Sequence, residues 1–440
     1  MTKGFTTRAV HGGEEKRKPY GALTTPVIRT STYTFSDTAE ILGFMESKAA
    51  GSDEVRDEYG RYSNPTQSAA ERKLADLEGG ERALLFASGM AAITTAMLAL
   101  LSSGDHVVMA FDCYHRTREF ARAFLGRWGI ETTLIKVNQP EAFGAAVQPN
   151  TRLIFAEMPT NPYLRVLDLP WVATLARGRG IKTMIDSTFA TPINLRPLEH
   201  GVDLVVHSAT KYLGGHNDLL AGVLVGDAET IAKIEHARGV MGGVSNPDDA
   251  YALIRGLKTL ELRVRRQNAS GWQVAQFLDS HPAVECVYYP GLSSHPDHEV
   301  AQDLMPGHGG VVSFEVDGDF EATGRFIDAL RLPYIGPTLG GVESIIEQPA
   351  ALFSLDPKER RAAGLVDNLV RYALGIEDTA DILADLDQAL AVLERPSETR
   401  NPAAKSRNPA TESRIGAESR NPQPHPAGAG DAGQQTGRRS

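Results

Sequence analysis

The segment from His207 to Asp218 most constrains the fold, because it places a lysine at the end of a buried strand. Residues 202–206 are nearly all apolar and predict a core strand, and residues 213–215 predict a turn. Lys211 therefore lies where the strand opens into a loop. A desolvated lysine there presents a neutral amine that can form a Schiff base with an aldehyde. The alternative is a surface lysine whose stem lies along the strand end.

A second predicted strand, at residues 181–185, ends in Asp186, about twenty-five residues before Lys211. A buried carboxylate is costly unless it pairs with a cation. The protonated ring nitrogen of pyridoxal phosphate is such a cation, and a carboxylate beside it makes the ring an electron sink. Asp186 and Lys211 together therefore indicate a pyridoxal phosphate site. For Asp186 alone, a helix N-cap or a structural ion pair stays open.

Hydroxyl and backbone groups for a phosphate are present as well. Ser208 and Thr210 precede Lys211, and their hydroxyls are suited to hydrogen bond a phosphate. The run Ser88–Gly89–Met90 follows a short apolar strand and opens a predicted helix. The free N–H groups at a helix N-terminus form a ready phosphate site, although many strand–glycine–helix junctions look alike.

Composition excludes several classes of protein. The 440 residues exceed what one hydrophobic core usually serves, so more than one domain is expected. The net charge of −10 comes without a basic stripe, which argues against a nucleic-acid surface. Two cysteines, Cys113 and Cys286, cannot form a disulfide framework or a cysteine-rich zinc site, and no metal is expected.

We expect a cytoplasmic protein that does not enter a membrane. The start of the chain, residues 1–5, has no apolar core typical of a signal peptide. Polar residues interrupt the most apolar window, residues 84–101, so a buried strand and helix are favoured over a membrane span.

The order of predicted elements indicates an α/β fold class. From about residue 80 to 225 the pattern alternates strand and helix, which favours a mostly parallel sheet, and the candidate residues follow strand ends. A long helix is predicted from Asp248 to about Gln276, followed by a smaller α/β domain. The predicted division is an N-terminal arm at 1–59, a large cofactor domain at 60–247, a small domain at 248–395 and a disordered tail at 396–440.

Several motifs in order along the chain identify a family. Asp186–Pro192 and Ser208–Asp218 resemble the pyridoxal phosphate enzymes of cysteine and methionine metabolism, the transsulfuration family. Within it, the plant-type γ-synthases are indicated by the segments Asp112–Arg118, Tyr288–Pro296, Gly309–Glu315 and Gly340–Pro349. The resemblance implies an aspartate-aminotransferase-like (fold type I) large domain, an extended arm on the neighbouring subunit, and a homotetramer of dimers with shared active sites.

The resemblance also assigns the site. Lys211 holds the cofactor as a Schiff base and moves protons, Tyr114 stacks on the ring, and Asp186 keeps the ring nitrogen protonated. The expected cofactor contacts are Tyr59, Arg61, Ser88, Gly89, Met90, Tyr114, Asn161, Asp186, Thr188, Ser208, Thr210 and Lys211, with Tyr59 and Arg61 reaching the neighbouring subunit. The expected substrate contacts are Arg371, Thr338, Leu339, Arg116 and Tyr59.

Three of these assignments have structural alternatives. In the first alternative, Tyr114 is a tyrosine of the hydrophobic core. In the second, Arg116 belongs to a solvated basic helix start instead of binding an anionic leaving group. Arg371 lies in an apolar predicted strand, where an unpaired guanidinium is costly. It binds the substrate carboxylate by resemblance, or else pairs with Glu377 or Asp378.

The expected reaction, by resemblance, is γ-replacement on an activated homoserine ester with cysteine as nucleophile, giving cystathionine. The same residues serve a γ-lyase that uses water, a sulfhydrylase that uses sulfide, or an enzyme that uses a carbon nucleophile. Pro337 stands where several relatives carry a polar residue, and this leaves the outcome open. A non-catalytic scaffold is the rival of another class.

Overall fold

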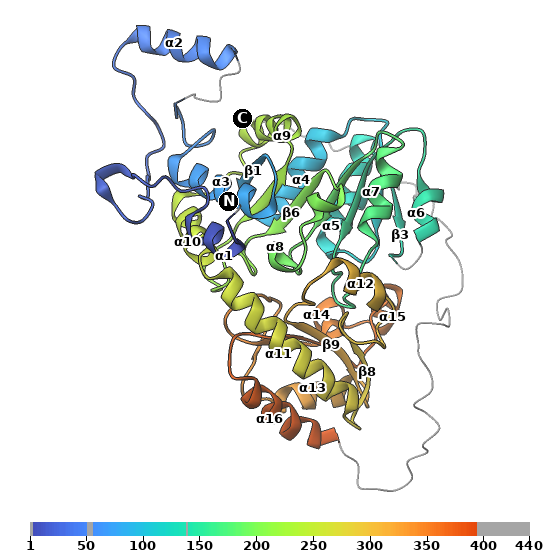
Figure 1. Ribbon diagram of the computed structural model, residues 1–440. Helices are drawn as coiled ribbons and strands as arrows, with labels where there is room; N and C mark the ends of the chain where they lie inside the picture. The colour runs from blue at the N-terminus through green and yellow to red at the C-terminus, as the bar shows by residue number, and fades with distance from the viewer. Residues whose placement is uncertain (1–2, 51–55, 138–139, 394–440) are drawn as a thin grey trace, which may run out of the picture. The chain divides into compact units, whose positions relative to one another are not determined.

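A seven-stranded sheet forms the larger half of the computed structural model, which describes residues 3–50, 56–137 and 140–393 (Figure 1). Its strands are β1 (Arg82–Phe86), β2 (His106–Ala110), β3 (Glu131–Ile135), β4 (Thr151–Glu157), β5 (Lys182–Asp186), β6 (Leu204–Ser208) and β7 (Gly222–Gly226). They lie in the order β1-β7-β6-β5-β4-β2-β3. Neighbours from β3 to β6 are parallel, and β7 runs antiparallel to β1 and β6. The prediction of a mostly parallel sheet is confirmed.

Helices cover both faces of this sheet, because its strands are apolar on both sides. The helices of this part are α3 (Pro65–Glu78), α4 (Gly89–Leu100), α5 (His115–Ala123), α6 (Pro140–Ala146), α7 (Leu169–Arg177), α8 (Thr191–Asn194) and α9 (Ala228–Met241). Leu84 of β1 packs in one core cluster with residues of α4 and α9. Its neighbour Leu85 packs in the opposite cluster with residues of α3, as the two-residue period of a strand requires.

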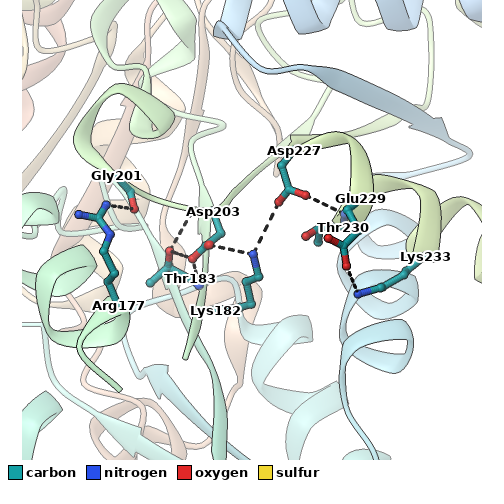
Figure 2. A network of polar contacts seen from close by, with 9 residues as sticks. All are labelled: Arg177, Lys182, Thr183, Gly201, Asp203, Asp227, Glu229, Thr230 and Lys233. Carbon is teal, nitrogen blue, oxygen red and sulfur yellow. Dashed lines mark hydrogen bonds and ion pairs between the residues drawn. The ribbon is translucent and has the colours of Figure 1, made fainter. Parts of the chain in front are cut away.

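A polar network joins the edge of the sheet where β5 and β6 begin (Figure 2). The Nζ atom of Lys182 lies 3.0 Å from Asp203 and 3.6 Å from Asp227, which follows β7. Asp203 also accepts hydrogen bonds from the backbone and hydroxyl of Thr183. These contacts fix the relative positions of β5, β6 and β7 at the end of the sheet opposite the carboxyl ends of β5 and β6.

The second sheet has five strands and is mainly antiparallel. Its strands are β8 (Val284–Tyr288), β9 (Val311–Val316), β10 (Tyr334–Ile335), β11 (Ile345–Glu347) and β12 (Leu369–Ala373), in the order β10-β11-β12-β9-β8. The accompanying helices are α12 (His298–Leu304), α13 (Phe320–Ala329), α14 (Pro349–Phe353), α15 (Pro357–Ala362) and α16 (Thr379–Leu390). We propose that the two sheets belong to the domains at 60–247 and 248–395. The predicted tail at 396–440 lies outside the described residues.

The prediction of one long helix after Asp248 is wrong, because the segment forms two helices, α10 (Pro247–Leu257) and α11 (Leu260–Ser280). Arg263, in the first turn of α11, donates to the backbone carbonyls of Gly256 and Tyr212. A Cβ atom added at Gly256 would overlap the carbonyl of Gly214 and lie 2.8 Å from that of Leu213. The break therefore accompanies close packing of the helix end on the loop that follows Lys211.

The expectation of an extended arm is wrong in part, since the arm contains α1 (Phe5–His11), a 3₁₀ turn at Pro19–Gly21 and α2 (Thr38–Ala49). Asp37 caps α2 by accepting a hydrogen bond from the backbone of Glu40. An N-cap aspartate with glutamate three residues later is a helix signal that could have been read from the sequence.

Glu14 fastens the first part of the arm to the rest of the chain. Its carboxylate lies 3.2 Å from the buried Lys73 of α3 and 3.0 Å from Lys258. Burial opposes ionisation, but the hydrogen bonds and charges of the two lysines lower the pKa of Glu14 to about 2.

No helix in the described ranges combines the length and apolar character that a membrane span needs.

Replacing Gly256 by alanine is expected to lower the free energy of urea unfolding by about 1–3 kcal/mol, because the added methyl group overlaps the facing backbone. The matched control is Gly324→Ala in α13, where nothing lies within 4 Å of the added Cβ atom. This control is expected to stabilise the protein by up to about 1 kcal/mol. Equal effects of the two substitutions would contradict the close packing at Gly256.

Candidate active site

The carboxyl ends of three neighbouring parallel strands bring the predicted residues of the large sheet together. Glu157 at the end of β4 lies in register with Asp186 at the end of β5. The Oδ1 atom of Asp186 accepts hydrogen bonds from the backbone and hydroxyl of Thr188, at 3.0 and 2.5 Å. The Thr188 hydroxyl in turn accepts from the backbone of Ser208 at the end of β6, at 2.8 Å. A chain of hydrogen bonds thus joins β5 to the strand that leads to Lys211.

Asp186 and Glu157 are both buried and share one small region. Burial raises the pKa of Asp186, while the hydrogen bonds from Thr188 oppose the rise. Burial and the charge of Asp186 raise the pKa of Glu157 well above its ordinary range. Glu157 accepts a 2.7 Å hydrogen bond from the backbone N–H of Tyr114. Glu157 therefore fixes the start of α5. Because its own pKa is raised, Glu157 is the neutral member of the pair and Asp186 the charged one.

Tyr114 lies at the N-cap position of α5 with its side chain partly exposed, so it is not a core tyrosine. Its ring contacts the ring of His115 edge to face, at 4.8 Å between centroids. A ring in this place has an open face on which a planar ligand can stack.

The start of α4 meets the end of β6 and the beginning of β7. The Ser88 hydroxyl caps α4 by accepting from the backbone of Ala91, and Gly89 and Met90 form the first turn, where N–H groups have no intrahelical acceptor. A Cβ atom at Gly89 would lie 3.0 Å from the Cβ atom of Ser208. These two residues could therefore not come so close with any other side chain at position 89, and the amides of α4 and the Ser208 hydroxyl line one cradle.

Thr210 differs from the expectation in its hydrogen bonds. Its hydroxyl accepts from the backbone N–H of Ala221 at 3.1 Å and lies 3.4 Å from the carbonyl of the same residue. Thr210 thus ties the lysine-bearing segment to the entry of β7. Its contact with a phosphate remains a prediction.

Lys211 follows β6 and is half-buried. Its Nζ atom donates a 2.7 Å hydrogen bond to the hydroxyl of Thr338, which comes from the other sheet's part of the chain. Burial and the positive charge of Arg371 lower the pKa of Lys211 to about 8. About a tenth of this amine is therefore neutral at pH 7, far more than for an ordinary lysine, and is able to attack an aldehyde.

Arg371 on β12 is buried beside Lys211. Its Nη1 atom donates to the side-chain oxygen of Asn161 at 3.1 Å, and Nη2 donates to the carbonyl of Thr338 at 3.2 Å. Nη2 also lies 2.9 Å from the carboxylate of Glu347, which stands directly opposite on β11. Asn161, Thr338 and Arg371 are thus brought together as predicted.

The alternative partners proposed for Arg371 are wrong. Glu377 accepts hydrogen bonds from the backbone and hydroxyl of Ser344. Asp378 pairs with Arg266 at 3.1 Å. Sequence reasoning missed Glu347, the partner that the structure shows, because pairing across β11 and β12 depends on a contact between distant segments. Its position in a short apolar run, where a carboxylate is costly, was the available signal.

The turn after Thr338 packs on the chain beside Lys211. Leu339 is buried, and Gly340 has a φ of 80°, in the left-handed region that favours glycine. A Cβ atom at Gly340 would lie 2.6 Å from the backbone nitrogen of Tyr212. Leu339 therefore lies near the lysine, although its contact with substrate remains a prediction.

Three predicted residues are not brought to this cluster within one chain. Arg61 donates to the carbonyl of Gly239, and its guanidinium lies over the ring of Tyr59 at 5.5 Å from the centroid. Arg116 on α5 pairs with Glu119 at 2.6 Å, and both side chains are mostly exposed. The described contacts of these three residues include none with Lys211 or Arg371.

The residues present fit pyridoxal phosphate. Both hydrogen bonds to the Asp186 carboxylate go to Oδ1, and among the described residues no donor reaches Oδ2. This atom is available for a ring nitrogen, the amides of α4 and Ser208 for a phosphate, and Lys211 for the aldehyde carbon. In the ranges that the structure covers, no group of three His, Cys, Asp or Glu side chains could hold a metal ion.

A lysine of lowered pKa, a buried aspartate and a helix N-terminus at the carboxyl edge of a mostly parallel sheet define a pyridoxal phosphate-dependent enzyme. The chain belongs to the family described as Cys/Met metabolism PLP-dependent enzyme, whose model matches residues 6–391. The predicted family and cofactor are confirmed.

Relatives with known structure or activity cover nearly the whole described chain. The chloroplastic cystathionine γ-synthase 1 of Arabidopsis thaliana is 48% identical over 389 residues, which are 87% of this chain and 68% of the relative. The L-methionine γ-lyase of Porphyromonas gingivalis is 41% identical, covering 89% of this chain and 98% of the lyase. The crystal structure of metB from Corynebacterium glutamicum matches with a TM-score of 0.82 at 37% identity, over 89% of this chain and 99% of that one. The predicted fold type I architecture is confirmed.

The expectation of a cytoplasmic protein is contradicted by these comparisons, since the Arabidopsis thaliana relative is a chloroplastic enzyme. The physical reason for the error is that a low cysteine content indicates a reducing compartment, and such a compartment is not unique to the cytoplasm.

Replacing Lys211 by alanine is expected to abolish the visible absorption band that pyridoxal phosphate acquires when it is joined to a lysine amine. The band is measured after adding the cofactor to the purified protein and removing the excess. Lys233→Ala, which removes an exposed lysine of α9, is expected to keep the full band. A band of equal intensity in the Lys211→Ala protein would exclude Lys211 as the attachment site.

Proposed function

We propose that the protein catalyses γ-replacement on an activated homoserine ester with cysteine, giving cystathionine. One observation carries the proposal: Thr338 accepts from Lys211 through its hydroxyl and from Arg371 through its carbonyl. An α-amino acid whose carboxylate binds Arg371 then presents its α-carbon close to the amine of Lys211. The relation to cystathionine γ-synthases supports the choice of reaction.

The side chains have separate tasks in this reaction. Pyridoxal phosphate, when bound, supplies an electron sink for charge that develops at the substrate α-carbon. Asp186 holds the ring nitrogen protonated, and Tyr114 offers its ring as a stacking surface. The neutral amine of Lys211 accepts the α-proton and returns it later, a role for which a lowered pKa is suited. Arg371 orients the carboxylate, and its guanidinium is held by Asn161, Thr338 and Glu347.

A second candidate is a γ-lyase reaction, in which water takes the place of cysteine. The relation to L-methionine γ-lyases supports it, because the chain is 41% identical to the Porphyromonas gingivalis enzyme. Sulfide or a carbon nucleophile would use the same residues. The two reactions share the steps at Lys211 and Arg371 and differ in what reaches the γ-carbon.

We also propose a homotetramer of dimers with active sites shared between subunits. Arg61 contacts the end of α9 in its own chain, and its guanidinium lies over the ring of Tyr59. A second copy would receive them at its cofactor phosphate, for which the guanidinium fork of Arg61 is suited.

The decisive experiment is a product assay with phosphoryl, succinyl and acetyl esters of homoserine, each with cysteine, with sulfide and with neither. Cystathionine is expected as the main product when cysteine is present. A 2-oxo acid formed at the same rate with or without cysteine would favour the γ-lyase reaction instead. No turnover of any ester by the cofactor-loaded protein would exclude γ-replacement on these esters.

Arg116→Ala is expected to raise KM for an anionic ester by about tenfold, the effect of losing about 1.4 kcal/mol of charge-assisted binding. The anionic leaving group, phosphoryl or succinyl, is our proposal for the role of this exposed arginine. Arg122→Ala, which removes a second exposed arginine of the same helix, is the control and is expected to leave KM unchanged. A preference for the acetyl ester that survives Arg116→Ala would refute the role.

A further inference from the structure

Glu347 holds the guanidinium of Arg371 in the Lys211 cluster but has no part in the proton transfers of the proposed reaction. It is 6% exposed, and its carboxylate pairs with Arg371 across β11 and β12. Among the described residues it has no other ion-pair or hydrogen-bond partner. Arg371 is therefore already neutralised by a buried anion before any ligand arrives.

Arg371 nevertheless has one N–H group that lacks an acceptor among the described residues. Its Nη atoms bind Asn161, Thr338 and Glu347, whereas its buried Nε atom has no acceptor among the described residues. A ligand carboxylate that binds this guanidinium places a second anion beside Glu347. Two carboxylates then share one cation away from water, an arrangement in which one of them is strongly favoured to become neutral.

We propose that Glu347 takes up a proton when a carboxylate ligand binds to Arg371, so that substrate binding at this site is linked to protonation of Glu347. The inference rests on the proposed function through the assignment of Arg371 as the carboxylate site. Glu347 is then a positioning residue. Its carboxylate holds the guanidinium in the free protein and becomes neutral when the substrate carboxylate binds.

The charges around Glu347 agree with this direction. Burial already raises the pKa of Glu347, and the opposing charges are those of Arg371 on β12 and Lys211 beyond β6. Arg371 itself faces Glu157 at the end of β4 and the Tyr212 hydroxyl. A ligand anion at Arg371 raises the pKa of Glu347 further, so the bound state holds more protons than the free state. Affinity for the ligand must then fall as pH rises between the two pKa values.

Butanoate is the probe, because it has the carboxylate but no amine that could release a proton of its own. Its binding to the cofactor-loaded full chain is measured by isothermal titration calorimetry at several pH values in buffers of different ionisation enthalpy. Proton uptake of up to about one per site is expected. The dissociation constant is expected to rise with pH by no more than about tenfold per unit.

Glu347→Gln is expected to bind butanoate without proton uptake and with little dependence on pH, since its side-chain oxygen can still accept from Arg371. Glu343→Gln is the matched control, because Glu343 lies four residues earlier, is exposed and accepts from Asn217. This control is expected to behave as the wild type. Infrared difference spectra of the wild type, recorded on adding butanoate, give a second test through the stretch of a protonated carboxyl group.

Binding without proton uptake in the wild type, or equal uptake in Glu347→Gln, overturns the inference. If Glu347→Gln does not fold, the inference is still overturned when the wild type shows no new protonated carboxyl band on adding butanoate. A wild type that does not bind butanoate at all overturns the inference together with the carboxylate site at Arg371. Failure of the proposed reaction shows separately in the product assay, which does not depend on the proton count.

Discussion

The removal of charged groups from water at the carboxyl edge of the large sheet is the constraint on which the rest of the structure depends. Asp186, Glu157, Arg371 and Glu347 are all buried there, and each ionised form is costly unless a counter-charge or hydrogen bond lies near. The fold meets this cost with local groups such as the hydroxyl of Thr188. Among the described residues, an acceptor atom of Asp186 and a donor atom of Arg371 have no hydrogen-bond partner. A cofactor and a substrate would supply these partners.

The two sheets contribute different parts of the chemistry. The large sheet provides Asp186 and Lys211, and the smaller sheet provides Arg371 together with its partner Glu347. Thr338 connects the two sets, because one residue contacts the amine and the guanidinium with different atoms. The distance between the lysine amine and the guanidinium that would bind the substrate carboxylate is therefore set at the junction of the sheets.

Much of the fold and the site could be predicted from local signals. Apolar runs marked β5 and β6, and the polar residues that end these strands, Asp186 and Ser208, lie at the site for that reason. Long-range pairing could not be read in this way: Glu347 faces Arg371 only because β11 and β12 associate. The break after α10 was also missed, because helical periodicity continues through it and its cause lies in the distant loop that contacts Gly256.

The contacts of Arg263 make the lysine-bearing loop and the beginning of α11 one mechanical unit, since the guanidinium holds the carbonyls of both Tyr212 and Gly256. The helix has 21 residues and extends for about 30 Å to the hydrophobic core of the smaller sheet, where Leu278 packs. Its first turn thus contacts the loop that carries Lys211, and its last turn packs in the core of the smaller sheet. Mutations at the far end can therefore tune the enzyme during evolution without altering any residue that a substrate touches.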